Sequence, residues 1–454
     1  MSRPRVFLLG AALLVLLLAL TPLVPRGERD GGLRPSGRDQ SAGWAEGWML
    51  SSSPGAGRIT AAMRTEIDRV VAAGRTAGRL SGKQPVGRLV SAFERCADLD
   101  GQTYCLGVGW TDQTQSQVQA RITVAARART LGREATGDLD ALDALARTAA
   151  LPPAARARAE RAELVRAARS VAKVWVLRHE IQGVPLPAGF LEEHPEARAP
   201  APTQAAEAQA TQAAPAATST PPPTTARGST QPTSAFTAPQ CPTCPITPSP
   251  SPSPSPTAVP VKTIADYPAK GIILDPTQVA EQTRTYWCGP TSMQMIAWGW
   301  KGVDKGQDYW AGKLGTTTSG TSITDMVRVT NGNTGWDLPS HAGKYVVLDV
   351  GDFTFQQWLL LNMKHIVDYT APLIYHPILL KRFYPYLDDD ASGHYQVGRG
   401  YLEQEGKPTE VSYFEPWNQQ RFDPSEPYIA RVQWRNAYRS YRANKAHFQH
   451  NVAV

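Results

Sequence analysis

One cysteine stands where a helix is predicted to begin. Cys288 is followed by Gly289 and Pro290, and proline suits the first turn of a helix because it lacks an N–H. Apolar residues then recur at helical spacing, at Met293, Ile296, Ala297 and Trp300. A thiol at a helix N-terminus faces the positive end of the helix dipole, which favours the thiolate. We therefore expect a nucleophilic cysteine, with a buried, inert cysteine as the alternative.

A thiol nucleophile needs a base within reach and a third group that orients the base. His394 begins a predicted strand, 393–401, that turns near residues 404–406. Hairpin geometry places the residue opposite His394 between Glu415 and Trp417. Glu415 lies in that window and could hold the imidazole in its charged form, and Asn418 is close by. A structural role for His394 is the alternative.

The chain has five cysteines, which fit an oxidising compartment. Cys96 and Cys105 flank a turn-like Asp-Leu-Asp-Gly and could close a small disulfide loop. Two more lie in a Cys-Pro-Thr-Cys sequence, at Cys241 and Cys244. Pairing these four leaves Cys288 unpaired, whereas an unpaired or interchain Cys241 or Cys244 is the alternative.

The first thirty residues read as a targeting segment. Arg3 and Arg5 precede an apolar run over 6–20, a pattern that directs the following chain out of the cytoplasm. We expect residues 1–30 to be a signal peptide or an N-terminal membrane anchor of a bacterial protein, and the mature chain to be secreted or membrane-anchored outside the cytoplasm. The net charge of +7 suits an anionic cell-envelope surface. We expect no nucleic-acid partner, because no nucleic-acid-binding motif accompanies the charge.

Composition divides the rest of the chain into three parts. Residues 57–195 are rich in Ala and Arg and predict a helical domain of unknown role, with helices over 60–71 and 138–149 and a long helix opening at 152–153. Residues 196–260 form a Pro/Thr/Ser-rich linker, which we expect to be disordered.

Residues 261–454 are rich in Trp and Tyr and have the length of one globular domain. After the Cys288 helix, we expect a helix over 323–329 and another over 353–366. Strands are predicted over 344–350, 370–375, 393–401 and 409–414. One leading helix followed by mainly antiparallel strands predicts an α+β fold.

This C-terminal domain resembles the papain-like cysteine peptidases that process the double-glycine leaders of bacteriocins, and more closely their free-standing exported relatives. Gln282 stands six residues before the Cys288-Gly-Pro sequence, as the family's oxyanion-hole glutamine does. The Gly-His-Tyr around His394 matches the strand that carries the family's base. The family's Asp-Pro is replaced by Glu415-Pro416, so either Glu415 or Asn418 could orient the histidine.

The resemblance covers roughly residues 265–420 and implies a papain-like fold and an exported thiol peptidase. Cys288 would be the nucleophile and His394 the base, with Glu415 or Asn418 as orienting group. Gln282 and the backbone N–H of Cys288 would receive the oxyanion. A peptide or protein substrate is implied, with no metal or organic cofactor. The alternatives are amide hydrolysis or transfer on cell-wall peptides, and a non-catalytic peptide-binding module that keeps the fold.

Overall fold

The computed structural model describes residues 54–77, 84–128, 135–198 and 261–454. The first three ranges are called the N-terminal region and the last one the C-terminal region. The predicted targeting segment 1–30, the predicted linker 196–260 apart from residues 196–198, and Cys241 and Cys244 lie outside the described residues. None of the helices in the described ranges is both long and apolar enough to span a bilayer.

A ten-stranded sheet runs through both regions. Its order is β1-β2-β3-β5-β10-β6-β7-β8-β9, and β4 also pairs with β7. The strands are β1 Cys96–Leu99, β2 Gln102–Cys105, β3 Gly109–Thr111, β4 Lys270–Ile272, β5 Val347–Asp349, β6 Leu373–Tyr375, β7 Gln396–Leu402, β8 Glu410–Phe414, β9 Val432–Asn436 and β10 Asn451–Ala453. All pairs are antiparallel except β3 with β5. With the helices below, this is a mixed α+β fold.

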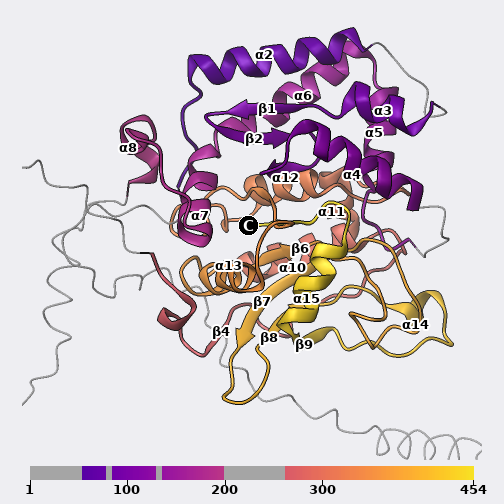
Figure 1. Cartoon of the computed structure of the whole chain (residues 1–454). Helices are drawn as coiled ribbons and strands as arrows, with labels where there is room; N and C mark the ends of the chain where they lie inside the picture. Colours follow the sequence, from indigo (N-terminus) through magenta and orange to yellow (C-terminus); the bar gives the residue numbers. More distant parts are fainter. Residues whose placement is uncertain (1–53, 78–83, 129–134, 199–260) are drawn as a thin grey trace, which may run out of the picture.

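The separate, mainly helical N-terminal domain that the sequence predicts is not clearly shown. Strand β3 joins the C-terminal sheet where Trp110 pairs with Leu348. Beside this pair, the Thr111 hydroxyl donates to the Asp349 carboxylate at 2.9 Å. One hydrophobic core contains buried side chains of both regions, among them Met63. The two regions therefore share a sheet and a core (Figure 1).

Helices of the N-terminal region pack around β1–β3. They are α2 Ala61–Thr76, α3 Val86–Phe93, α4 Gln115–Ala128, α5 Ala141–Ala150, α6 Pro153–Ala168, α7 Val171–Gln182 and α8 Phe190–Glu193, followed by the 3₁₀ turn η2 Pro195–Ala197. Thr60 caps α2 by accepting the N–H of Met63. The single long helix predicted from Pro152 is two helices, because the chain leaves helical geometry between Ala168 and Val171. The predicted Cys96–Cys105 disulfide is confirmed and joins β1 to β2.

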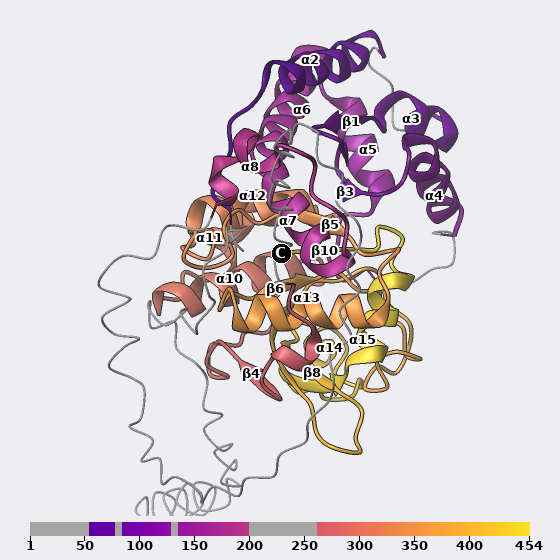
Figure 2. The same ribbon diagram turned by 60° about the vertical axis from the view of Figure 1, so that its left-hand side comes forward.

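The C-terminal region adds the helices that flank the sheet. They are η3 Ile264–Asp266, α10 Cys288–Lys301, α11 Gln307–Leu314, α12 Ile323–Asn333, α13 Phe355–Val367, α14 Gln419–Phe422 and α15 Ala437–Ala446. Helices α10 and α13 both contact β7, and α13 also contacts α7 of the N-terminal region. Figures 1 and 2 place α7 and α12 where the two regions meet, with the C-terminus of the chain nearby.

Candidate active site

Cys288 is the first residue of α10. The helix ends at Gly302, whose φ of 68° is the left-handed conformation that glycine adopts readily. The thiol is free and fully buried. Burial raises the pKa of the thiol well above its ordinary value, although the backbone N–H groups of Tyr395 and Gly289 oppose the shift. The thiolate expected from the helix dipole is therefore not the favoured form while the sulfur is buried.

His394 and Glu415 meet at one end of the β7–β8 hairpin. Val397 lies opposite Phe414, so the residues just before β7 and just after β8 come together. Nε2 of His394 is 2.8 Å from Oε1 of Glu415, and both side chains are fully buried. The hairpin thus brings the Glu415 carboxylate within hydrogen-bond distance of the imidazole, although glutamate is one methylene longer than aspartate.

Three further donors hold the Glu415 carboxylate. Oε1 accepts the backbone N–H of Trp417 at 2.9 Å. Oε2 accepts the Tyr386 hydroxyl at 2.8 Å and the Gln396 amide at 2.7 Å. Burial raises the pKa of Glu415, but the His394 charge and these hydrogen bonds outweigh it, so the pKa lies below its ordinary value. Glu415 is therefore ionised and is an acceptor only.

When His394 is in its neutral form, the ionised Glu415 requires the ring proton to sit on Nε2. Nδ1 then carries a lone pair. It is buried and has no hydrogen-bond partner within the described ranges. The backbone N–H of the next residue, Tyr395, lies near the Cys288 sulfur and lowers the pKa of the thiol against the effect of burial. Neutral His394 therefore presents an unprotonated nitrogen in the segment just before β7, and the same segment approaches the thiol through Tyr395.

Gln282 is fully buried and tied into the loop before α10. Its backbone N–H donates to the carbonyl of Pro416 at 2.8 Å, which connects it to the segment after Glu415. Its side-chain Nε2 faces three backbone carbonyls, those of Thr285 at 2.9 Å, Arg284 at 3.0 Å and Thr136 at 3.4 Å. The Gln282 amide group, which the sequence predicts to donate to an oxyanion, thus already donates to backbone carbonyl oxygens.

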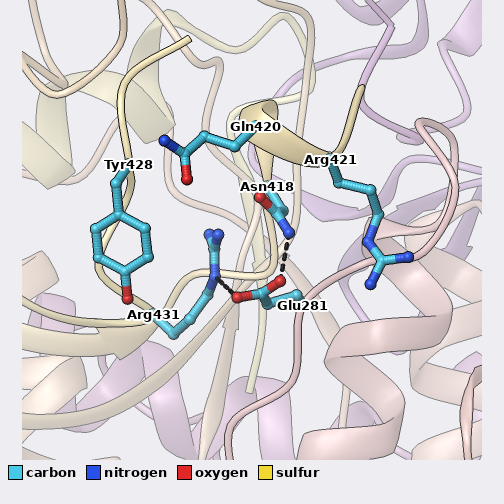
Figure 3. Close-up of a pocket in the computed structure, with 6 residues that line it drawn as sticks. All are labelled: Glu281, Asn418, Gln420, Arg421, Tyr428 and Arg431. Atoms are coloured by element: carbon cyan, nitrogen blue, oxygen red, sulfur yellow. Dashed lines mark hydrogen bonds and ion pairs between the residues drawn. The ribbon is translucent and has the colours of Figure 1, made fainter. Parts of the chain in front are cut away.

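Asn418 binds a carboxylate other than Glu415. Its side-chain nitrogen donates to the carboxylate of Glu281, which also binds Nε of Arg431 at 3.0 Å. Figure 3 shows both side chains directed at Glu281, in a surface pocket of about 310 Å³ that is also lined by Gln420, Arg421 and Tyr428. Of the two proposed orienting groups, the structure brings only Glu415 into contact with the imidazole.

A second polar cluster, which the sequence analysis missed, adjoins the first. Asp138 of the N-terminal region lies between two histidines. Its Oδ1 is 3.0 Å from Nε2 of His376, and its Oδ2 is 3.0 Å from Nε2 of His447. Burial raises the pKa of Asp138, but His376 and His447 outweigh it and hold the pKa well below its ordinary value. Burial and the His376 charge lower the pKa of His447 to about 4. Only the fold could reveal this cluster, because Asp138 and His447 are 309 residues apart.

The donor atoms of this cluster lie within 4.8 Å of one another, as metal ligands would. However, Nδ1 of His447 accepts the backbone N–H of Gln449 at 3.1 Å, so the neutral ring carries its proton on Nε2. That proton points at Asp138 and occupies the lone pair that a metal would need. The cluster is therefore an arrangement of hydrogen bonds and ion pairs that anchors Asp138.

Residues 275–446 match the family model described as Peptidase_C39 like family. The match includes Gln282, Cys288, His394 and Glu415, and it excludes Asp138. No curated protein and no solved structure matches the chain. The C-terminal region therefore contains, over residues 275–446, a domain of the Peptidase_C39 like family, a relative of the papain-like cysteine peptidases.

Proposed function

We propose that the chain is an exported thiol peptidase in which Cys288 and His394 cleave peptide bonds through an acyl-enzyme. The observation that carries the proposal is the pair of contacts around the His394 ring. Its Nε2 is held by the ionised Glu415, and its buried Nδ1 has no hydrogen-bond partner within the described residues, next to Tyr395, whose backbone N–H approaches the Cys288 sulfur. This is the nucleophile, base and orienting group that acyl transfer requires.

In the proposed reaction, Nδ1 of His394 takes the thiol proton as the Cys288 sulfur attacks the carbonyl carbon of a peptide. The tetrahedral intermediate collapses when the C–N bond breaks, and the imidazolium gives its proton to the leaving amine. Water then attacks the thioester while His394 removes its proton, which releases the carboxylic acid and restores the thiol. Glu415 stays ionised throughout and stabilises the imidazolium.

The backbone N–H of Cys288 and the side-chain amide of Gln282 would receive the oxyanion. One such donor contributes about 3 kcal/mol in comparable enzymes. The longest of the three contacts of the Gln282 amide is the one to Thr136, at 3.4 Å. We expect the amide to exchange this contact for the substrate oxygen.

Export remains part of the proposal. The apolar segment over 6–20 suggests it, and the Cys96–Cys105 disulfide supports an oxidising compartment. We therefore propose that the peptidase acts at or outside the cell envelope, either secreted or tethered by its N-terminal segment.

Incubation of the full chain with a mixed peptide library, read by mass spectrometry, tests the proposal. We expect peptide cleavage that is lost in Cys288→Ala and in His394→Ala, while both variants keep the thermal unfolding transition of a folded protein. Cleavage that persists in folded Cys288→Ala would refute the mechanism. Muropeptide substrates in a parallel incubation separate a general peptidase from an enzyme acting on cell-wall peptides, and a folded protein that binds peptides without cleaving them would be a binding module.

A further inference from the structure

Three of the residues assigned to the reaction are closed off from solvent. Cys288, His394 and Gln282 are each 0 % exposed. Part of the cover is a short segment of the N-terminal region, Thr136 to Leu139, which is called the strap. It lies just before α5 and outside the segment that matches the family.

The strap lies beside the C-terminal region as an added strand would. The carbonyl of Gly137 accepts the N–H of Thr321 at 2.9 Å, and the carbonyl of Thr321 accepts the N–H of Leu139 at 2.9 Å. Asp138 and Thr321 form a parallel bridge. Extended peptides are commonly recognised by such backbone pairing. The edge at Thr321 is close to the nucleophile, because the Thr321 side chain lies against Gly289.

Thr136 binds the residues just before the proposed base. Its N–H donates to the Ser392 hydroxyl at 3.0 Å, and its own hydroxyl donates to the Gly393 carbonyl at 2.5 Å. The Thr136 carbonyl in turn faces the Gln282 amide at 3.4 Å. The Thr136 carbonyl therefore lies where we expect the substrate oxygen to accept a hydrogen bond from the Gln282 amide.

Gly137 passes the nucleophile loop at a distance that excludes a side chain. A Cβ built on it would lie 2.4 Å from the carbonyl carbon of Tyr286 and 2.9 Å from the nitrogen of Trp287, the residue before Cys288. Its φ of 113° is also one that other residues rarely adopt. Beyond it, Asp138 is fixed between His376 and His447.

We propose that the strap occupies the peptide-binding groove of the enzyme and blocks Cys288 until it is displaced. The inference rests on the proposed function in that the groove is taken to be where a substrate peptide lies. An extended peptide would replace the strap and form the same backbone bonds to Thr321 and to the Ser392 hydroxyl. The N-terminal region thus supplies an internal competitor for the substrate site.

Alkylation of Cys288 by iodoacetamide in the full chain tests the strap without requiring turnover. Peptide mapping identifies the labelled cysteine, because Cys241 and Cys244 are also present in the chain. Gly137→Val should expel the strap and raise the rate of Cys288 labelling at least tenfold. Gly183→Val is the matched control, since Gly183 also has a positive φ, of 72°, but a Cβ there meets nothing within 4 Å. It should label at the wild-type rate.

A second pair of variants tests whether the strap blocks Cys288 if Gly137→Val fails to fold. Thr136→Ala removes the hydroxyl bound to the Gly393 carbonyl and should label severalfold faster than wild type, whereas Thr136→Ser keeps the hydroxyl and should not. Equal labelling rates in wild type and folded Gly137→Val, or in the two Thr136 variants, would overturn the inference. Faster labelling without any peptide cleavage would support the inference about the strap but contradict the proposed peptidase function.

Discussion

The Glu415 carboxylate lies 2.8 Å from Nε2 of His394, in a position where related peptidases are expected to carry the shorter aspartate. The longer side chain is accommodated because Tyr386 and Gln396 bind its second oxygen. These two donors fix the carboxylate plane and let the remaining oxygen face the imidazole. The substitution therefore does not by itself argue against catalysis.

Replacing Glu415 by Gln should lower kcat by about 10²-fold or more, because the neutral amide cannot stabilise the imidazolium. The loss should be smaller in Glu415→Asp, which keeps the charge but shortens the reach. Steady-state kinetics of the two variants across pH provide the measurement. Asn418→Ala is the control, since Asn418 binds Glu281 instead, and it should change kcat by less than about threefold. A larger loss in Asn418→Ala than in Glu415→Gln would reverse the assignment of the orienting group.

Gln282→Ala should lower kcat by about 10²- to 10³-fold through loss of an oxyanion donor. The same change also leaves the carbonyls of Arg284 and Thr285 without their partner, so some stability is lost as well. Gln307→Ala separates the two effects. Gln307 accepts the N–H of Thr283 and donates to the Glu281 carbonyl, and so supports the same loop away from the sulfur. Comparable losses of kcat in both variants, at comparable melting temperatures, would mean that Gln282 acts only structurally.

The rate at which Cys288 reacts with iodoacetamide should depend on pH in a way that reports burial. Burial raises the thiol pKa, so wild-type labelling should be slow at neutral pH and should rise only above the range of an ordinary thiol, pH ~8.5. In Gly137→Val, water reaches the sulfur and His394 can take its proton, so the midpoint should move to lower pH. The rate–pH profiles of the two proteins check this. A wild-type midpoint well below pH ~8.5 would contradict the buried, protonated state.

Local sequence patterns predicted the contacts of the hairpin well. The predicted strand over 393–401, the turn that contains Gly406 and the return strand together bring His394 to the window that contains Glu415. The shift of register between Gly398 and Gly400 was not predicted. The helix that begins at Cys288 and ends at Gly302 could also be predicted from the local sequence. These features depend on neighbours in the chain, which the sequence displays directly.

The remaining features depend on pairings that a local pattern does not encode. The Trp110–Leu348 pair that joins the two regions links strands of three residues each, too short for alternation to be recognised. The strap contains no apolar repeat, and its role arises from the backbone of Thr321. The raised thiol pKa arises from burial, which helix position alone does not reveal.

The stability of the folded protein should fall between about pH 6.5 and pH 4, in part because of His447. Burial and the His376 charge lower its pKa to about 4, so the unfolded chain binds a proton in this range and the folded protein does not. A depressed histidine pKa therefore stabilises the fold above pH 6.5, and this stabilisation is lost as the pH falls. From the size of the shift, the loss is roughly 3 kcal/mol.

Urea unfolding at pH 7 and pH 4.5 measures this loss in wild type and in His447→Gln. The glutamine amide can donate to Asp138 as the imidazole does but cannot be protonated, so the variant should lose less stability on acidification. The difference between the two proteins isolates His447, since other buried histidines such as His365 titrate in both. An identical loss in the two proteins would mean that His447 is not held neutral beside Asp138. The anchor of the strap would then have to be another contact, such as the Thr136 hydroxyl on Gly393.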